Sequence, residues 1–335
     1  MNVVSEFKVP KYISDAGIEF LPHGVITKSH TGMGATYLEL ISPRNSILVE
    51  PIKYTAYSKV GSYNKEKIAK EHGEALYVGS EVIQGDKPVN QDLITRYVKN
   101  KKIKVKKIIC VADSLYKVVE VLLKCKLLDD YFLLIDEIDS IQTDSSFRYR
   151  IEQCLDIYFM FPKEKRALLT ATPIDFSNDK LKDEDKTNFT LESPNYTDLQ
   201  FFQTYTGIEV LTKRILDFIN DTSEELPIAV CVNSIKAIQT LINTLVDRFH
   251  VDDSQIGVLC GSQSEFQLQK YVVEMKSQKY PKPITFFTSA YYLGYDINTE
   301  YKLFILADYK YPNTLLSGGQ VKQIAGRYRG KRTTP

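Results

Sequence analysis

The stretch Lys28-Ser29-His30-Thr31-Gly32-Met33-Gly34-Ala35-Thr36 decides the fold of this 335-residue chain. It follows a short apolar run, Gly24-Val25-Ile26-Thr27, and precedes a helix-like segment from Tyr37 to Leu40. Glycines at such a strand-to-helix turn bring backbone N–H groups close to phosphate oxygens. A loop of this kind usually ends in Gly-Lys-Thr or Gly-Lys-Ser, whereas Ala35 takes the place of the lysine here. The stretch therefore predicts a phosphate-binding loop that lacks its usual cation.

The pattern around this loop predicts an α/β fold. Short apolar runs alternate with longer amphipathic stretches, which is typical of parallel sheets flanked by helices. Strands are expected in the first half at 24–28, 46–49, 108–112, 132–135 and 167–170. A second series is expected at 228–233, 256–259, 284–289 and 302–306. Helices are expected at 115–125, 208–219 and 235–249.

The length of the chain predicts two domains, because 335 residues are more than a single hydrophobic core usually serves. The segment 177–186 is charged and poor in apolar residues, which favours a surface connection, with the break between the halves after Pro173. We place the boundary near residue 195. Domain 1 then spans 1–195 and domain 2 spans 196–335.

The composition excludes several classes of protein. The chain is 43% hydrophobic and 25% charged, with a net charge of +1, so any basic surface must be local. No apolar run reaches the roughly 20 residues of a membrane helix, and the N-terminus lacks the apolar core of a signal peptide. The five cysteines are scattered without a CxxC pair, which is typical of reduced cytoplasmic proteins. We expect no membrane partner.

A second motif, Leu133-Leu134-Ile135-Asp136-Glu137-Ile138-Asp139, ends an apolar strand in carboxylates. In a phosphate-loop enzyme the first Asp holds Mg²⁺, and the following Glu orients and deprotonates the attacking water. An acidic strand end exposed to solvent is the alternative. The position of the motif downstream of a glycine loop favours the metal and base roles for Asp136 and Glu137.

Two further strand and helix ends carry polar groups. In 167–173, Thr170 and Thr172 can hydrogen-bond the acidic strand end and relay the state of the nucleotide, although a plain strand-to-turn ending is the alternative. Near the C-terminus, 320–330 places two arginines after a glycine, and arginine suits bidentate phosphate recognition. A basic tail is the alternative there.

Taken in order, the four motifs resemble those of the superfamily 2 helicases of the DExD/H type. The resemblance implies two tandem RecA-like domains with ATP and Mg²⁺ in the cleft between them. It implies nucleotide contacts at Lys28, Thr31, Gly32, Met33, Gly34, Ala35, Thr36, Gly294 and Asp296, with Mg²⁺ on Thr36 and Asp136. It implies catalytic roles for Asp136, Glu137, Gln323, Arg327 and Arg329, and coupling through Asp139, Thr170 and Thr172. Weaker matches imply nucleic-acid contacts at Pro51, Asp113, Ser114, Asn233 and Thr288.

A narrower resemblance concerns the source of the chain. The spelling Gly326-Arg327-Tyr328-Arg329 is similar to viral origin-binding helicases, and the loop followed by 38–40 and 44–51 resembles helicase-like proteins of Bacteroides phages and mobile elements. It implies a nucleic-acid-dependent ATPase that acts as a helicase or translocase in DNA replication or recombination of a phage or mobile element. DNA is favoured over RNA, replication proteins are expected partners, and the location is a bacterial or phage-infected host cytoplasm. The alternative is a nucleotide-binding pseudo-helicase without turnover that acts as a nucleic-acid-binding or recruiting scaffold.

Three explanations of Ala35 stay open at this point. Lys28, at the end of the preceding strand, can reach back over the loop and replace the missing charge. The chain can bind nucleotide without turning it over, or Ala35 is an engineered substitution that traps a bound state. A working or formerly working ATPase is favoured by the groups that the chain keeps, namely Thr36, Asp136, Glu137, Arg327 and Arg329.

Lysines gather in one segment of the first half. Residues 99–107 hold six lysines in nine residues, and the alternation of Ile103 and Val105 predicts a strand with several lysines on one face. Such a face can contact phosphates, or it can be a solvated edge that resists strand pairing.

Overall fold

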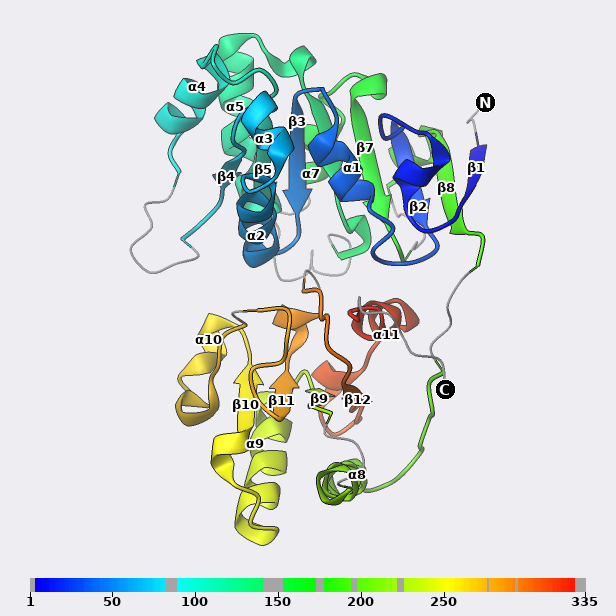
Figure 1. Ribbon diagram of the computed structural model, residues 1–335, viewed down its shortest axis with the longest axis vertical. Coiled ribbons are helices and arrows are strands. Elements are labelled where there is room, and N and C mark those ends of the chain that lie inside the picture. The colour runs from blue at the N-terminus through cyan, green and yellow to red at the C-terminus, as the bar shows by residue number, and fades with distance from the viewer. Residues whose placement is uncertain are drawn as a thin grey trace. The chain divides into compact units, whose positions relative to one another are not determined.

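The computed structural model describes residues 4–81, 89–140, 153–172, 178–193, 198–221, 226–275, 277–292 and 295–328. The chain divides into two compact units, Met1–Asn195 (unit 1) and Tyr196–Pro335 (unit 2). Each unit is a parallel sheet with flanking helices (Figure 1). Among the described residues, no helix is long and apolar enough to cross a membrane.

Unit 1 is built on an eight-stranded sheet in the order β1-β8-β2-β7-β6-β3-β5-β4, and every pairing in it is parallel. The strands are β1 (Val4–Val9), β2 (Gly24–Lys28), β3 (Ser46–Glu50), β4 (Leu76–Val78), β5 (Lys107–Val111), β6 (Phe132–Ile135), β7 (Arg166–Thr170) and β8 (Lys186–Leu191). Because all strands run the same way, their carboxyl ends meet at one edge of the sheet. That edge receives the phosphate-loop and acidic motifs.

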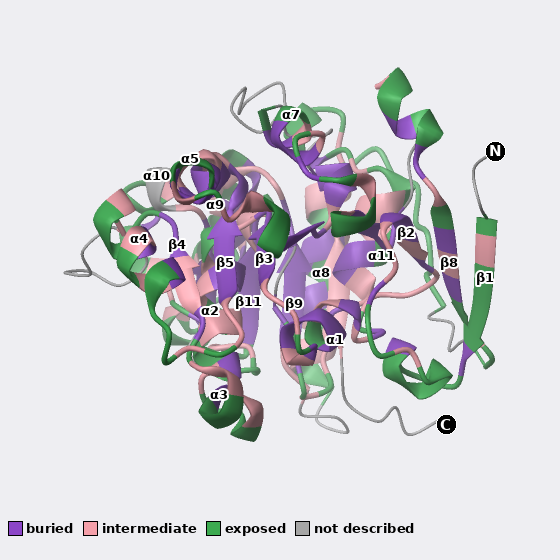
Figure 2. Cartoon of the chain, turned by 90° about the horizontal axis from the view of Figure 1, so that it is seen from above, coloured by how far each residue is buried: buried purple, intermediate pink, exposed green. Residues whose placement is uncertain are grey.

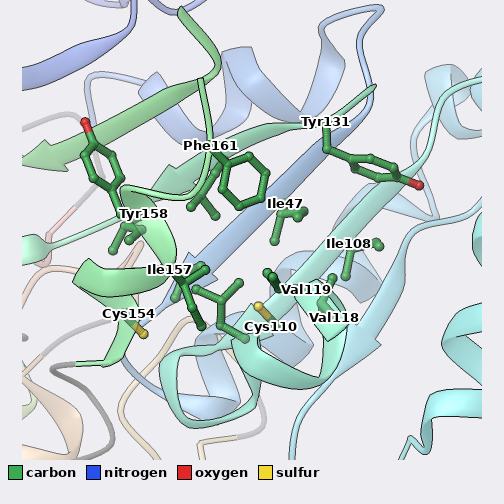
Figure 3. Packing of buried hydrophobic residues seen from close by; sticks show 14 of the residues in the cluster. Ile47, Ile108, Cys110, Val118, Val119, Tyr131, Cys154, Ile157, Tyr158 and Phe161 are labelled. Atoms are coloured by element: carbon green, nitrogen blue, oxygen red, sulfur yellow. The ribbon is translucent and has the colours of Figure 1, made fainter. Parts of the chain in front are cut away.

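Helices cover both faces of this sheet. They are α1 (Ala35–Ile41), α2 (Lys53–Tyr63), α3 (Lys67–His72), α4 (Gln91–Lys99), α5 (Leu115–Cys125) and α7 (Gln153–Tyr158). Short 3-10 turns lie at Ile13–Ala16, Ala112–Ser114, Leu128–Asp130, Lys163–Lys165 and Asp179–Asp183. Successive residues of β3 point to opposite faces of the sheet and pack in different clusters. Ile47 packs with residues of α5 and α7 (Figure 3), and Val49 belongs to the same cluster. Leu48 packs with residues of α1 and α2.

The burial of each strand explains whether the sequence predicted it. Every residue of β3, β5 and β6 is buried, which is what a strand covered on both faces requires (Figure 2). The outer strand β1 exposes most of its residues, and β8 alternates between buried Thr187 and Phe189 and more exposed neighbours. Strands β1, β4 and β8 were not expected. Polar residues interrupt β1 and β8, and β4 is apolar but only three residues long.

The expected break between the halves after Pro173 is wrong. Strand β8 follows the charged segment and pairs with β2 on one side and with β1 on the other, so it completes the sheet of unit 1. The charged residues form a connection inside this unit, with a 3-10 turn at Asp179–Asp183.

The lysine-rich segment is not a strand before Lys107. Lys99 is the last residue of α4, and β5 begins only at Lys107. The backbone N–H groups of Lys104 and Val105 both donate to the carbonyl of His72, which holds the connection against α3. Lys107 itself is buried, so it does not share the exposed face expected for this segment.

Unit 2 is built on four parallel strands in the order β10-β11-β9-β12. They are β9 (Ile228–Cys231), β10 (Ile256–Leu259), β11 (Ile284–Phe287) and β12 (Lys302–Ile305). The helices are α8 (Gly207–Asn220), α9 (Ile235–Asn243), α10 (Ser262–Glu265) and α11 (Gly318–Ala325). A π-helical turn, Thr244–Arg248, continues α9, and 3-10 turns lie at Asp253–Gln255, Gln269–Tyr271, Ser289–Tyr291 and Pro312–Thr314. Val230 and Phe286 share an apolar cluster with residues of α8 and α9.

Candidate nucleotide site

The glycine loop makes a sharp turn between β2 and α1. Gly32 and Gly34 both have φ of 77°, in the left-handed region that glycine enters without strain. A Cβ at Gly34 would also lie 3.3 Å from the ring of Tyr12. The glycines of the motif are therefore required by the backbone path that leads from Lys28 into α1.

Asp136 stands at the centre of the site in unit 1. It directly follows β6, and its N–H donates to the carbonyl of Val49 in the neighbouring strand β3 at 2.9 Å. The Thr36 hydroxyl donates to Asp136 Oδ2 at 2.7 Å, and Lys28 Nζ lies 3.7 Å from Oδ1. The structure thus brings together three residues that the sequence placed at the site: Lys28, Thr36 and Asp136.

Two further residues complete this cluster and were not singled out from the sequence. Lys59, in α2, places its Nζ 2.6 Å from Glu50 Oε1 and 3.3 Å from Asp136 Oδ2. Glu50 is the last residue of β3, next to the strand that ends before Asp136. Two acidic groups at the ends of adjacent buried strands require a nearby cation. In the sequence, this requirement is the feature that could have pointed to a lysine such as Lys59.

The charges of this cluster are mutually compensated. Burial raises the pKa of Asp136, but Lys28 and Lys59 outweigh it and lower the value to about 2. Burial raises the pKa of Glu50 to about 7, against the opposing effect of Lys59. Burial also acts to lower the pKa of Lys59, but Glu50 and Asp136 raise it above its usual value. Asp136 is therefore ionised at neutral pH and faces two ammonium groups.

Glu137 follows Asp136 in an unusual backbone conformation. Its φ is 49°, and its N–H donates to Asp136 Oδ1 at 2.9 Å. Its carbonyl accepts hydrogen bonds from the N–H and the hydroxyl of Ser140, at 2.9 and 2.7 Å. A left-handed residue other than glycine is strained by about 1–3 kcal/mol and persists only where its surroundings hold it. These bonds fix the turn that carries the half-buried Glu137.

The hydroxyl groups at the end of β7 bond to Asp139 as the sequence led us to expect. Thr170 Oγ1 donates to Asp139 Oδ1 at 2.7 Å, and Thr172 Oγ1 donates to Oδ2 at 2.5 Å. The N–H of Thr172 donates in turn to Thr170 Oγ1 at 3.0 Å. Strands β6 and β7 are neighbours, which brings their ends together. The role of these bonds in relaying nucleotide state stays a prediction.

In unit 2, the candidate arginine is held inside the unit. Arg327 follows α11, is buried, and donates from Nε to the carbonyl of Gln323 at 2.9 Å. A small pocket there is lined by Arg327 and by aromatic residues that include Tyr291 and Tyr295, whose rings stack with centroids 4.7 Å apart. Asp296 is exposed. Gly294 and Arg329 lie outside the described residues.

The residues expected to contact nucleic acid follow the carboxyl ends of strands in both units. Pro51 follows β3, and Asp113 and Ser114 follow β5, at the edge that holds Asp136. In unit 2, Asn233 follows β9 and accepts from the N–H of Ser289 at 3.1 Å. Its side-chain amide donates to the carbonyl of Asn313 at 3.0 Å. Thr288 follows β11 and is buried.

The oxygens at Asp136 and Thr36 are of the kind that Mg²⁺ prefers. Mg²⁺ is usually bound by one or two carboxylates together with phosphate oxygens and water. The described part of the chain has no group of three or more His, Cys, Asp or Glu side chains that could hold a metal by itself. The residues therefore fit a cation shared with a phosphate ligand.

Comparison with known proteins identifies the fold. No family model and no curated protein matches the chain. Solved structures do match. Saccharomyces cerevisiae Dbp5 bound to RNA and ADP BeF3 is 18% identical, with 92% of this chain and 76% of that chain covered and a TM-score of 0.54. The DEAD-box helicase Mss116 bound to ssRNA and UDP-BeF is 15% identical, with 84% and 60% covered and a TM-score of 0.56. The chain has the fold of two tandem RecA-like domains found in DEAD-box helicases.

A DNA-bound helicase has a similar fold. Mycobacterium smegmatis Lhr bound to ssDNA and AMP-PNP is 16% identical, with 82% of this chain and 39% of that chain covered and a TM-score of 0.50. The α/β class expected from the sequence is therefore confirmed.

Proposed function

We propose that this protein is a nucleic-acid-dependent ATPase that acts as a superfamily 2 helicase or translocase. The observation that carries the proposal is the convergence of the phosphate loop and the acidic strand end on one carboxylate, through Thr36 and Asp136. The similar solved structures hold nucleotide analogues together with RNA or ssDNA.

The roles follow from the chemistry of each group. Thr36 and Asp136 hold Mg²⁺, which when bound neutralises phosphate charge. The backbone of the loop from Thr31 to Ala35 surrounds the phosphates, and Lys28 supplies the cation that Ala35 lacks. Glu137 orients and deprotonates the attacking water.

Unit 2 supplies the remaining groups in this proposal. Gln323, Arg327 and Arg329 stabilise the negative charge that develops on the transferred phosphate, and Gly294 and Asp296 contact the nucleotide. Coupling between nucleotide and nucleic acid runs through Asp139, Thr170 and Thr172.

The nucleic acid contacts residues that follow strand ends in each unit, namely Pro51, Asp113 and Ser114 in unit 1 and Asn233 and Thr288 in unit 2. These positions suit contact with the sugar–phosphate backbone and little sequence preference. We further propose DNA as the substrate and replication or recombination of a phage or mobile element as the setting, with replication proteins as partners. The narrower sequence resemblance supports this last part.

Phosphate release by the full chain tests the function. It is measured with ATP alone and with single-stranded DNA, duplex DNA or RNA. We expect stimulation by nucleic acid, and a loss of about 10²–10⁴-fold in Lys28→Ala, because a preorganised cation beside the transferred phosphoryl group is removed. The exposed Lys8→Ala is the matched control. Equal turnover in wild type and Lys28→Ala would exclude the replacement role of Lys28.

A second candidate function rests on Ala35. Without the loop lysine, the chain can bind nucleotide and nucleic acid as a scaffold and leave ATP intact. ATP binding without phosphate release, under every nucleic-acid condition above, would favour this alternative.

A further inference from the structure

Lys59 belongs to the candidate site by position but has no role in the proposed reaction. It lies in α2, outside all the motifs, and its ammonium bridges Glu50 and Asp136. Two lysines therefore compensate two buried carboxylates in the ligand-free chain, with Lys28 near one oxygen of Asp136 and Lys59 near the other. Glu50 accounts for one contact of Lys59, and Lys28 already lies beside Asp136, so the additional contact of Lys59 with Asp136 needs an explanation.

The position of Lys59 places its charge beside the start of α1. Its Nζ contacts Asp136 Oδ2, the oxygen that also accepts the hydrogen bond from Thr36. Thr36 follows Ala35, where phosphate loops carry their lysine. The ammonium of Lys59 is therefore linked, through Asp136 and Thr36, to the residue next to the position of the missing lysine.

The side chains of Lys28 and Lys59 differ in their exposure to solvent. The side chain of Lys59 is 27% exposed, whereas that of Lys28 is 7% exposed. A four-carbon stem lets the ammonium turn to a new partner, while Glu50, 2.6 Å away, holds it near the edge of the sheet. A divalent cation that binds Asp136 also competes with Lys59 for the same carboxylate oxygen.

We propose that Lys59 is a second phosphate-binding cation that, together with Lys28, replaces the loop lysine absent at Ala35. In the ligand-free chain its ammonium neutralises Asp136. In the nucleotide complex it leaves Asp136 for the terminal phosphates of ATP and keeps Glu50 as its anchor. This inference rests on the proposed nucleotide site in unit 1.

Equilibrium binding of ATP and ADP tests the inference apart from turnover. Affinities of the full chain for both nucleotides are measured with Mg²⁺ for wild type, Lys59→Met and Lys53→Met, and thermal unfolding is recorded for each. Lys53 is an exposed lysine of the same helix and serves as the matched control. We expect Lys59→Met to weaken ATP binding at least about tenfold and ADP binding much less, because a charge-assisted contact to the terminal phosphate is lost. Lys53→Met should bind like wild type.

The outcomes are distinguishable. Lys59→Met that is folded and binds ATP as wild type does, or loses ATP and ADP equally, would show that Lys59 is only a structural ion-pair partner. If the single variant does not fold, Glu50→Gln with Lys59→Met removes both charges and is measured against Glu50→Gln alone. A wild-type chain that binds neither nucleotide would overturn the nucleotide site itself, and this inference with it.

Discussion

The buried side chain of Lys107 connects three elements of unit 1, namely α1, β3 and β5. Its ammonium donates to the carbonyls of Glu39 and Arg44 at 2.6 and 2.8 Å and to the hydroxyls of Ser46 and Ser42 at 3.0 and 3.1 Å. These groups belong to the end of α1 and the start of β3, so one side chain ties both elements to β5. Lys107→Met should lower the free energy of unfolding by about 1–3 kcal/mol, because buried oxygens lose their donor. Urea unfolding measures the loss, with the exposed Lys104→Met as a nearby comparison.

The same residue gives a pH dependence. Burial lowers the pKa of Lys107 from 10.5 to about 7, although Glu39 acts against it. Between these values the unfolded chain binds a proton that the folded chain does not, so the free energy of unfolding contributed here rises with pH from about 7 to 10.5 and is constant below. Unfolding at pH 7 and pH 9 should therefore show wild type gaining stability relative to Lys107→Met. A constant difference between the two proteins would contradict the lowered pKa.

Ala35 offers a direct test of charge replacement. It is the first residue of α1, directly after the left-handed Gly34. If Lys28 supplies the missing cation, Lys28→Ala should be inactive, and adding Ala35→Lys to it should restore phosphate release. Thermal unfolding of each variant confirms that the comparison is between folded proteins. A folded double variant without activity would mean that the loop cannot use a lysine at position 35.

At the scale of elements, sequence patterning identified the strands whose two faces are buried and the helix Leu115–Cys125 with its observed bounds. It missed β1, most of whose residues are exposed, and β8, whose buried and more exposed residues alternate and which begins in a charged stretch. It also placed Lys28, Thr36 and Asp136 at one site, because the phosphate-loop and acidic motifs occur in the order found in helicases. The structure brings the three residues together. The link between Glu50 and Lys59 was missed, since it joins a strand end to a helix that no motif marked.

The lysine-rich connection between α4 and β5 belongs to the opposite edge of the sheet. It precedes β5, whereas the candidate site follows the strand ends, and a five-residue strand spans about 16 Å. That separation exceeds the screening length of about 8 Å at physiological ionic strength. Substitution of Lys99, Lys101, Lys102 and Lys104 by alanine should therefore leave nucleic-acid-stimulated phosphate release unchanged, as titrated against DNA concentration. A weaker response to DNA would show that this segment contacts nucleic acid.

At the scale of the whole molecule, both units place their candidate residues after strand carboxyl ends. Asp136 and Thr172 do so in unit 1, and Asn233 and Thr288 do so in unit 2. The resemblance to solved structures at 15–18% identity shows that this two-unit arrangement of sheets is kept where few residues are shared. Function is then decided by the residues at these edges rather than by the fold.

A variant of Arg327 tests whether the two units contribute differently to ATP binding and ATP hydrolysis. The phosphate loop, Thr36 and Asp136 all belong to unit 1, so ATP binding should survive the loss of Arg327, whose proposed partner is the transferred phosphate. If Arg327 stabilises the transferred phosphate as we propose, Arg327→Gln should lower phosphate release by about 10³-fold or more, while ATP affinity changes little. Arg248→Gln, an exposed arginine of the same unit, should match wild type. A folded Arg327→Gln protein with normal turnover, or with binding and turnover lost together, would contradict this assignment of roles to the two units.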